Sequence, residues 1–280
     1  STLLPEARQS TPPSPVKVKL PDCQVDLRPS LPACMQYTPE TCWATAVAQL
    51  AGYFDPSHNP ESQDFERLGT SGLDINLQRA QSCLGMECRV LGNIIAPNIM
   101  DACCTDEVEP ARSSSQCQQA GYPEWILKGI QWTSGQDYIL WNAPLTEIQL
   151  IQTLLRGHPM PFSVRWTTGG GHTMIIGGCS GKGTYYVHDS LSNLTIAPPW
   201  LELTWEEIFH YSPYGQVGLS QEWFQKKGEW PTAAILKAYL NKTHNFGQWD
   251  ATYILRKDVC DIFQLYDPEQ SSKFCAIPKL

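Results

Sequence analysis

The chain has 280 residues and a formal net charge of −8 at pH 7, and no run of basic residues stands out. This length suffices for one large domain or two small ones, each with a hydrophobic core. The acidic balance disfavours nucleic acid and anionic membrane surfaces as partners, and no apolar run approaches the ~18 residues of a membrane span.

The cysteines are numerous, and their count is odd. Eleven occur, at positions 23, 34, 42, 83, 88, 103, 104, 117, 179, 260 and 275. Such a number is typical of an oxidising compartment, so we expect a secreted or periplasmic protein. The simplest expectation is five disulfides with Cys42 left free. A zinc site built from the cysteines at 83, 88, 103 and 104 is the alternative. Because no Cys-x2-Cys pair occurs, we expect neither a metal nor another cofactor.

The N-terminal part has little regular pattern. Residues 1–20 carry four prolines among serines and threonines and predict an extended lead-in. Residues 21–35 are loop-like, and we expect disulfides to hold their two cysteines, Cys23 and Cys34.

The first strong signal is an amphipathic helix that begins at Cys42 and ends near Gly52. Its apolar residues recur at i, i+3, i+4 and i+7: Trp43, Ala46, Val47, Leu50, Ala51 and Phe54. Thr38 or Thr41 can cap its start. Cys42 therefore lies in or next to the first turn, where the helix dipole favours a thiolate.

Two further helices follow a polar, turn-rich stretch over residues 55–82. A short helix over residues 124–128 is expected to end at Gly129, because glycine commonly terminates helices. A second helix before Gly157 has one apolar face, formed by Leu145, Ile148, Ile151, Leu154 and Leu155.

Three strands come next. Residues 162–166 predict a strand, a glycine-rich loop follows, and residues 172–176 and 184–188 predict a hairpin. The two strands of a hairpin run in opposite directions, so the start of one lies beside the end of the other. We therefore expect His172 and Asp189 to lie side by side.

Four residues match the needs of thiol catalysis. A cysteine attacks a carbonyl as thiolate and needs a base, a group that orients the base, and donors for the oxyanion. Cys42, His172 and Asp189 supply the first three roles, and Gln36, six residues before Cys42, can donate to the oxyanion. The other histidines considered, His158, His188, His210 and His244, are expected to lack such partners, and His188 to face away from Asp189.

These residues resemble those of the papain-like cysteine peptidases. The resemblance rests on Gln36, on the run Cys42-Trp43-Ala44 at a helix start, on His172 after glycines, and on Asp189 after the next strand. The order of these features is most similar to the bacterial papain-like peptidases, which include secreted effector enzymes. Two departures are Glu40-Thr41 before the cysteine and aspartate, rather than asparagine, at position 189.

The resemblance implies a disulfide-stapled α+β fold with two lobes and a cleft between them. A helical lobe carries Cys42, and a β-rich lobe carries His172 and Asp189. It implies a catalytic domain over residues 21–217, with residues 218–280 as a C-terminal extension packed on it. The motif from Thr204 to Glu207 predicts a capped helix through Phe209, and the resemblance implies that Trp205 shields the His172–Asp189 pair.

The expected function is a secreted thiol hydrolase, in the first place an endopeptidase acting on protein or peptide substrates. Two alternatives stay open. One is a papain-like toxin that acts as a deamidase, amidase or transglutaminase with the same triad. The other is a catalytically dead, disulfide-rich binding module. The sequence gives neither the substrate preference nor the oligomeric state.

Overall fold

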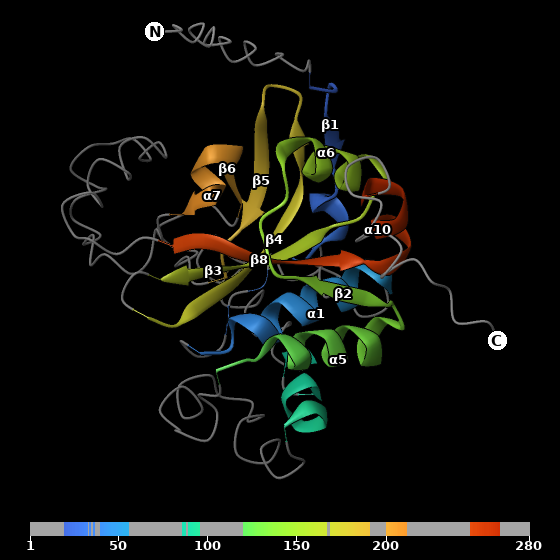
Figure 1. Cartoon of the computed structure of the whole chain (residues 1–280). Helices are drawn as coiled ribbons and strands as arrows, with labels where there is room; N and C mark the ends of the chain where they lie inside the picture. Colours follow the sequence, from blue (N-terminus) through green and yellow to red (C-terminus); the bar gives the residue numbers. More distant parts are fainter. Residues whose placement is uncertain are drawn as a thin grey trace, which may run out of the picture.

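The computed structural model describes residues 20–32, 34, 36, 40–55, 86, 87, 89–95, 120–166, 169–190, 200–211 and 247–263. In chain order its helices and strands are β1 (Gln24–Asp26), η1 (Arg28–Ser30), α1 (Cys42–Phe54), α5 (Pro123–Ser134), β2 (Tyr138–Trp141), α6 (Glu147–Leu155), β3 (Met160–Trp166), β4 (Gly171–Ser180), β5 (Thr184–His188), β6 (Trp200–Thr204), α7 (Trp205–Phe209), β7 (His210–Tyr211), β8 (Gly247–Leu255) and α10 (Arg256–Phe263). The strands form an antiparallel sheet that packs with the helices, which confirms the α+β class (Figure 1).

The sheet brings distant parts of the chain together. Its strand order is β2-β8-β3-β4-β5-β6, with β1 paired to β4 and β7 paired to β8. β8 falls within residues 218–280, the predicted C-terminal extension, yet it lies between β2 and β3. This segment therefore supplies an interior strand of the same sheet as the predicted catalytic domain. Local sequence patterns do not carry such long-range pairing.

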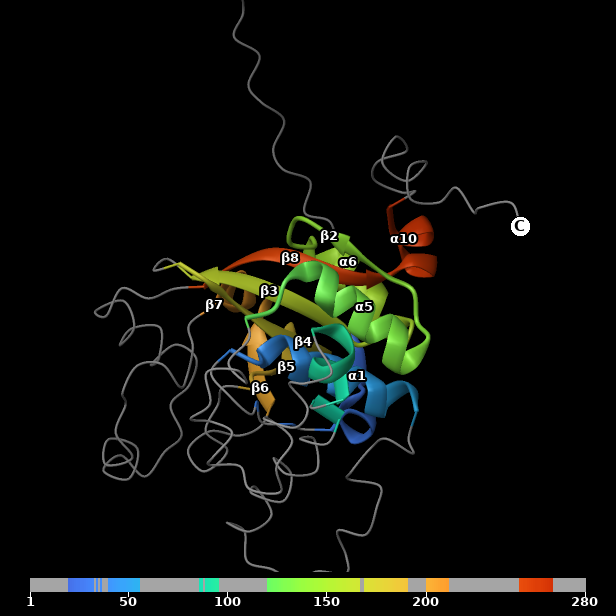
Figure 2. The ribbon, with the colours of Figure 1, turned by 90° about the horizontal axis from the view of Figure 1, so that it is seen from below.

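Hydrophobic side chains pack on both faces of the sheet. On one face α1 and α5 cover a cluster that includes Trp43 and Ile175. On the other face α6, α7 and α10 contribute to a cluster that includes Leu150 and Ile176. Ile175 and Ile176 are neighbours on β4 and enter different clusters, as alternating strand side chains do. In both ribbon views α1 and α5 lie side by side (Figures 1 and 2).

The helix predicted to begin at Cys42 forms where it was expected. α1 begins at Cys42 and runs to Phe54, two residues past Gly52. Thr41 is the N-cap residue but makes no side-chain capping hydrogen bond, and Thr38 lies outside the described residues. Apart from its last two residues, Tyr53 and Phe54, the whole helix is buried, because α5 and β4 both pack on it.

The prediction that Gly129 ends a helix was wrong. α5 runs from Pro123 to Ser134 and ends at Gly135, which has a φ of 67°. A Cβ atom on Gly129 would lie 3.1 Å from both γ carbons of Val47 on α1. The glycine at 129 therefore lets two helices approach closely, whereas the glycine at 135 takes the left-handed conformation that terminates a helix.

The β4–β5 hairpin agrees with the sequence, and its neighbour β1 does not. β5 spans the predicted residues, and β4 extends past the predicted 172–176 to Ser180. Residues 21–35 were predicted as loop but contain β1, which pairs with the end of β4. With three residues, β1 is too short to show an alternating pattern.

The helix α7 begins as expected, whereas α6 begins at Glu147, so Leu145 of the predicted apolar face precedes the N-cap residue Thr146. Thr146 and Gln149 form a capping box at α6, and Thr204 and Glu207 form one at α7, as predicted. Leu155, assigned to the buried face of α6, is 49% exposed. It is the last helical residue, and the buried face is instead formed by Leu150, Ile151 and Leu154 with the polar Gln149 and Thr153.

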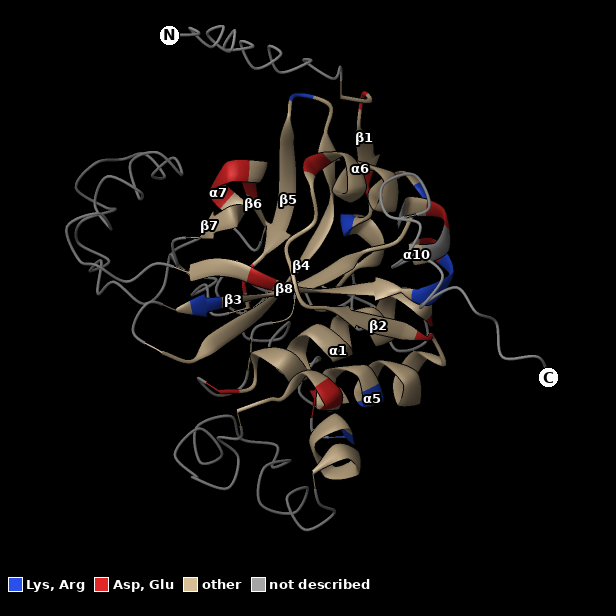
Figure 3. Ribbon diagram, viewed as in Figure 1, with Lys and Arg blue, Asp and Glu red and all other residues tan. Residues whose placement is uncertain are grey.

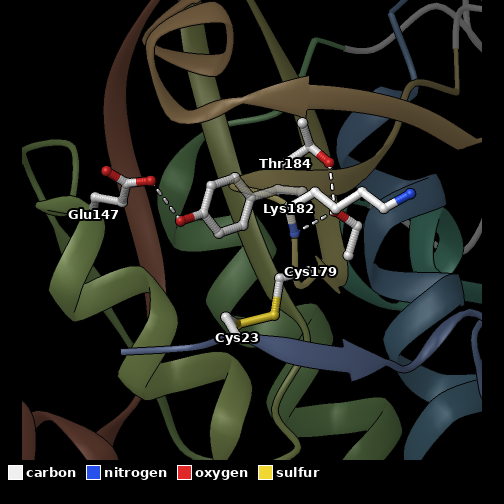
Figure 4. Close-up of a disulfide and its surroundings, with 7 residues drawn as sticks. Cys23, Glu147, Cys179, Lys182 and Thr184 are labelled. Carbon is white, nitrogen blue, oxygen red and sulfur yellow. Dashed lines mark hydrogen bonds between the residues drawn. A yellow bond between two sulfur atoms is a disulfide. The ribbon is translucent and has the colours of Figure 1, made fainter. Parts of the chain in front are cut away.

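Three of the cysteines expected in disulfides are confirmed. Cys23, next to β1, is bonded to Cys179 on β4 (Figure 4), and Cys34 is also disulfide-bonded. The other predicted disulfides involve cysteines beyond the described side chains. No helix in the described ranges is long and apolar enough to cross a membrane.

Replacing Cys23 and Cys179 with serine should destabilise the protein. The bond closes a loop with a sequence separation of 156, and opening it returns chain entropy to the unfolded state. We expect the free energy of unfolding to fall by about 4 kcal/mol. Urea unfolding of the oxidised protein and the double variant measures this difference, and equal midpoints with equal slopes would contradict it.

Candidate active site

A cavity of about 490 Å³ lies beside the start of α1. Helices α1 and α5 form one wall, and strands β3, β4 and β8 form the other. Cys42 and His172 both line it. The residues expected to act as nucleophile and base therefore reach one cavity from a helix start and a strand start.

Cys42 is held at the first position of α1. The residue is 9% exposed, and among the cysteines whose side chains are described it is the free one. The backbone N–H of Thr173 donates to Cys42 Sγ at 3.4 Å. The sulfur therefore faces an N–H donor and the positive end of the helix dipole.

His172 and Asp189 meet as the hairpin predicted. His172 Nε2 lies 2.7 Å from Asp189 Oδ1, and the two side chains are 1% and 0% exposed. The Tyr211 hydroxyl donates to the other carboxylate oxygen, Oδ2, at 2.5 Å. Tyr211 on β7 thus orients the Asp189 carboxylate, which in turn orients the imidazole of His172 on β4.

The protonation of His172 follows from these contacts. Burial disfavours the charged imidazolium, but the charge and hydrogen bond of Asp189 outweigh it, and a hydrogen bond with the Cys42 side chain adds to them. Together they raise the pKa of His172 to about 10. Because Nε2 is bonded to Asp189, Nδ1 is the ring nitrogen left for Cys42. At neutral pH His172 is therefore an imidazolium.

The aromatic residue that stacks on His172 is Trp166, and the expectation that Trp205 shields the His172–Asp189 pair was wrong. Trp166 stacks on His172 with ring centroids 6.0 Å apart and an interplanar angle of 16°. Trp205 donates to the Leu145 carbonyl and stacks on Phe209. The signal for Trp166 was available in the hairpin register, because pairing Val164 with His172 places residues 164, 166 and 172 on one face.

Gln36 is tied to the turn that follows Asp189. Its backbone N–H donates to the Ser190 carbonyl at 3.0 Å, and its Oε1 accepts from the Ser190 hydroxyl at 2.9 Å. The amide Nε2 therefore points away from Ser190. The described residues that line the cavity do not include Gln36, so its role as oxyanion donor stays a prediction.

A second histidine–aspartate pair lies elsewhere in the fold. Nδ1 of His158 is 2.6 Å from Asp258 Oδ2, although His158 was expected to lack such a partner. Asp258 belongs to α10, a hundred residues later, so no local sequence pattern could predict the contact. Neither residue lines the cavity of Cys42. The pair joins the end of α6 to α10, a helix that carries both basic and acidic residues (Figure 3).

Replacing Asp189 with asparagine should be milder than removing either partner of the thiol–imidazole pair. Asn can still accept from His172 Nε2, and the Tyr211 hydroxyl can rotate to accept from its amide. We expect kcat/KM to fall by about tenfold. Because the carboxylate charge raises the pKa of His172, the basic limb of the pH–rate profile should move to lower pH. Complete loss of turnover would show that the charge itself is required.

His188 faces the other side of β5, as the alternation predicted. It is 1% exposed, and neither ring nitrogen has a hydrogen-bond partner among the described residues. It packs edge-on against Trp200 with centroids 5.1 Å apart. Burial lowers its pKa to about 4, despite the nearby charge of Asp189. His188 is therefore a neutral core residue at neutral pH.

This buried histidine should make the fold acid-sensitive. Its pKa is about 4 in the folded protein against 6.5 for an unperturbed histidine. The unfolded chain therefore binds the proton first, and stability falls as pH drops from 6.5 towards 4. Relative to His188→Leu, the wild type should lose about 3 kcal/mol over this window. Parallel urea unfolding curves at each pH test this, and the same pH slope for both proteins would refute it.

Comparison with known proteins gives no family. No protein-family model matches the chain, and no curated protein matches it. In the described part of the chain no group of three or more His, Cys, Asp or Glu side chains is arranged to hold a metal ion. The cysteines of the zinc alternative, at 83, 88, 103 and 104, lie outside the described residues.

Proposed function

We propose that the chain is a secreted papain-like cysteine peptidase that uses Cys42, His172 and Asp189. The observation that carries the proposal is the placement of a free, helix-starting Cys42 and a buried, aspartate-bound His172 on one cavity. Two lobes, α1 with α5 and the sheet with its outer helices, would then flank the cleft. The Cys23–Cys179 disulfide fits an oxidising compartment.

The geometry supports a two-step acyl transfer. Cys42 Sγ attacks the carbonyl carbon of a peptide bond, and the carbonyl oxygen becomes an oxyanion. The Cys42 backbone N–H and the Gln36 amide would donate to this oxygen. His172 gives its proton to the leaving amine, and the C–N bond breaks to leave a thioester on Cys42. His172 then takes a proton from water, whose oxygen attacks the thioester carbonyl; the C–S bond breaks, the carboxylic acid leaves, and Cys42 returns as the thiolate beside the imidazolium.

Tyr211 and Trp166 support this cycle without contacting the substrate carbonyl. Tyr211 fixes the Asp189 carboxylate, and Trp166 covers the ring of His172. Exclusion of water strengthens the His172–Asp189 interaction, because charges interact more strongly in a low-dielectric site. The imidazole is therefore held in one orientation through both proton transfers.

Cleavage of a denatured proteome tests the proposal. New N-termini are labelled and identified by mass spectrometry, and ammonia release is measured in the same reactions. Peptide-bond cleavage with little ammonia is the expected result. Ammonia without new N-termini would indicate a deamidase, and amine-dependent cross-linking would indicate a transglutaminase. If neither occurs and iodoacetamide does not label Cys42, the chain is an inert binding module.

A further inference from the structure

Beside the nucleophile, three hydroxyl groups from neighbouring strands face the same cavity. Ser163 on β3, Thr173 on β4 and Tyr253 on β8 all line it. Ser163 Oγ lies 3.0 Å from Thr173 Oγ1 and 3.4 Å from the Tyr253 hydroxyl oxygen. Thr173 is also the residue whose backbone N–H reaches Cys42 Sγ. One residue, Thr173, therefore contributes a hydroxyl to this cluster and a backbone N–H to the proposed nucleophile.

The sheet register explains why the three side chains converge. Ser163 pairs with Thr173 across β3 and β4, so their side chains share a face. On the other side of β3, the pairing with β8 shifts between Ser163 and Val164 and leaves Asp250 as an extra residue. This β-bulge changes the alternation of β8, so that Trp249 and Tyr253 enter clusters on opposite faces.

The hydrogen-bonding capacity of the cluster can be counted. Three hydroxyls carry three O–H protons, and the two internal contacts use two of them, which leaves one O–H donor and several oxygen lone pairs. Burial raises the pKa of Tyr253, so the phenol keeps its proton at neutral pH. The cluster thus offers one donor, several acceptors and no charge.

The rest of the cavity favours an uncharged side chain with an apolar stem. Trp43 and Ile126, from the two helices, supply apolar wall. The charged pair Arg165 and Asp250 also lines it, but Arg165 Nε and Nη2 lie 3.0 and 2.9 Å from Asp250 Oδ2. Because each neutralises the other, this pair selects neither a lysine nor a glutamate of the substrate. Glu40 is a further carboxylate of the lining, and it disfavours a glutamate side chain.

We propose that the Ser163–Thr173–Tyr253 cluster makes the peptidase select a substrate side chain that ends in a primary carboxamide, glutamine before asparagine. The inference rests on the proposed peptidase function. A carboxamide oxygen accepts the one spare O–H, and its NH₂ group donates to the lone pairs. The two methylenes of glutamine lie against the apolar wall. A thioether or aliphatic side chain of similar size leaves the buried hydroxyls without these bonds.

A peptide library tests this selection. Peptides carry Gln, Asn, Glu, Met or Leu at each position near the scissile bond, and kcat/KM is measured for each. At one position, wild-type protein should favour Gln over Met, a side chain of similar length, by about tenfold or more, as two net hydrogen bonds imply. Cleavage without an amide preference at any position would overturn the inference alone. No cleavage of any peptide would overturn the proposed function, and this inference with it.

Two triple variants isolate the cluster. Ser163→Ala, Thr173→Val and Tyr253→Phe together should reduce the Gln-to-Met ratio to within about twofold, since no hydroxyl of the cluster remains. The matched control is Ser180→Ala, Thr184→Val and Tyr185→Phe, which removes the same three residue types from the β4–β5 turn (Figure 4). The control should keep the wild-type ratio.

A retained ratio in the cluster variant, with native circular dichroism, would overturn the inference. If this variant does not fold, the pair Ser163→Ala and Tyr253→Phe replaces it, with a smaller expected reduction of the ratio. An unchanged ratio in the pair would overturn the inference equally.

Discussion

Replacing Cys42 with alanine is expected to abolish hydrolysis and to leave the fold intact. The thiol carries the covalent step, and the nearby hydroxyls of Ser163 and Thr173 are far weaker nucleophiles, so we expect turnover to fall by at least about 10⁴-fold. The fold should survive because alanine is a good helix former at the start of α1. Turnover is measured on the best library peptide, beside circular dichroism and thermal unfolding of both proteins. A Cys42→Ala protein with a native spectrum and wild-type turnover would contradict the assignment of Cys42 as the nucleophile.

Replacing His172 with alanine should cause the second-largest loss of activity. Two proton transfers depend on this ring, so we expect kcat/KM to fall by about 10³-fold or more. Iodoacetamide should also alkylate Cys42 more slowly near neutral pH, because the thiolate loses the adjacent imidazolium. The rate of alkylation is followed by intact mass.

His188 provides the matched control for this experiment. It is buried on the same hairpin but faces Trp200 instead of the cavity. His188→Leu should keep the alkylation rate of Cys42 at neutral pH. Equal alkylation rates in the His172→Ala and wild-type proteins would show that Cys42 and His172 do not act as a pair.

The sequence predicted the parts of the site that depend on local patterns. Cys42 was placed at a helix start from the spacing of apolar residues, and α1 begins there. His172 and Asp189 were placed together because the two strands of a hairpin run in opposite directions, and β4 and β5 do so. A 2.7 Å contact joins the two side chains. In each case the signal lies within one helix or one hairpin.

The residues that the sequence did not reveal depend on contacts between distant segments. Tyr211 reaches Asp189 through β7, and Tyr253 reaches Ser163 through β8. Both strands join the sheet by long-range pairing, which costs loop-closure entropy. Such pairing produces no periodic pattern of apolar residues in the sequence. Gly129 was mistaken for a helix end because its packing partner, Val47, lies on another helix. The resemblance implied Trp205 as the shielding aromatic, whereas the structure stacks Trp166 on His172 through the pairing of β3 with β4.

Long-range contacts also bear on the predicted boundary between a catalytic domain ending at residue 217 and an extension over residues 218–280. α10 follows β8 directly, and its Val259 and Ile262 belong to the hydrophobic cluster on the sheet face that α6 and α7 also cover. The side chains of β8 also line the cavity of Cys42. A fragment that ends at residue 217 would therefore lose one wall of the proposed active site.

Alkylation of the native protein without reductant tests the central claim, that Cys42 is the nucleophile, most directly. The fraction of Cys42 carrying carbamidomethyl is determined by peptide mapping at several times, and peptide hydrolysis is measured in the same samples. We predict one label per molecule, on Cys42, with hydrolysis falling in proportion to the labelled fraction. Full hydrolysis by protein whose Cys42 is completely labelled would contradict the account, as would a native disulfide at Cys42 with the free thiol elsewhere.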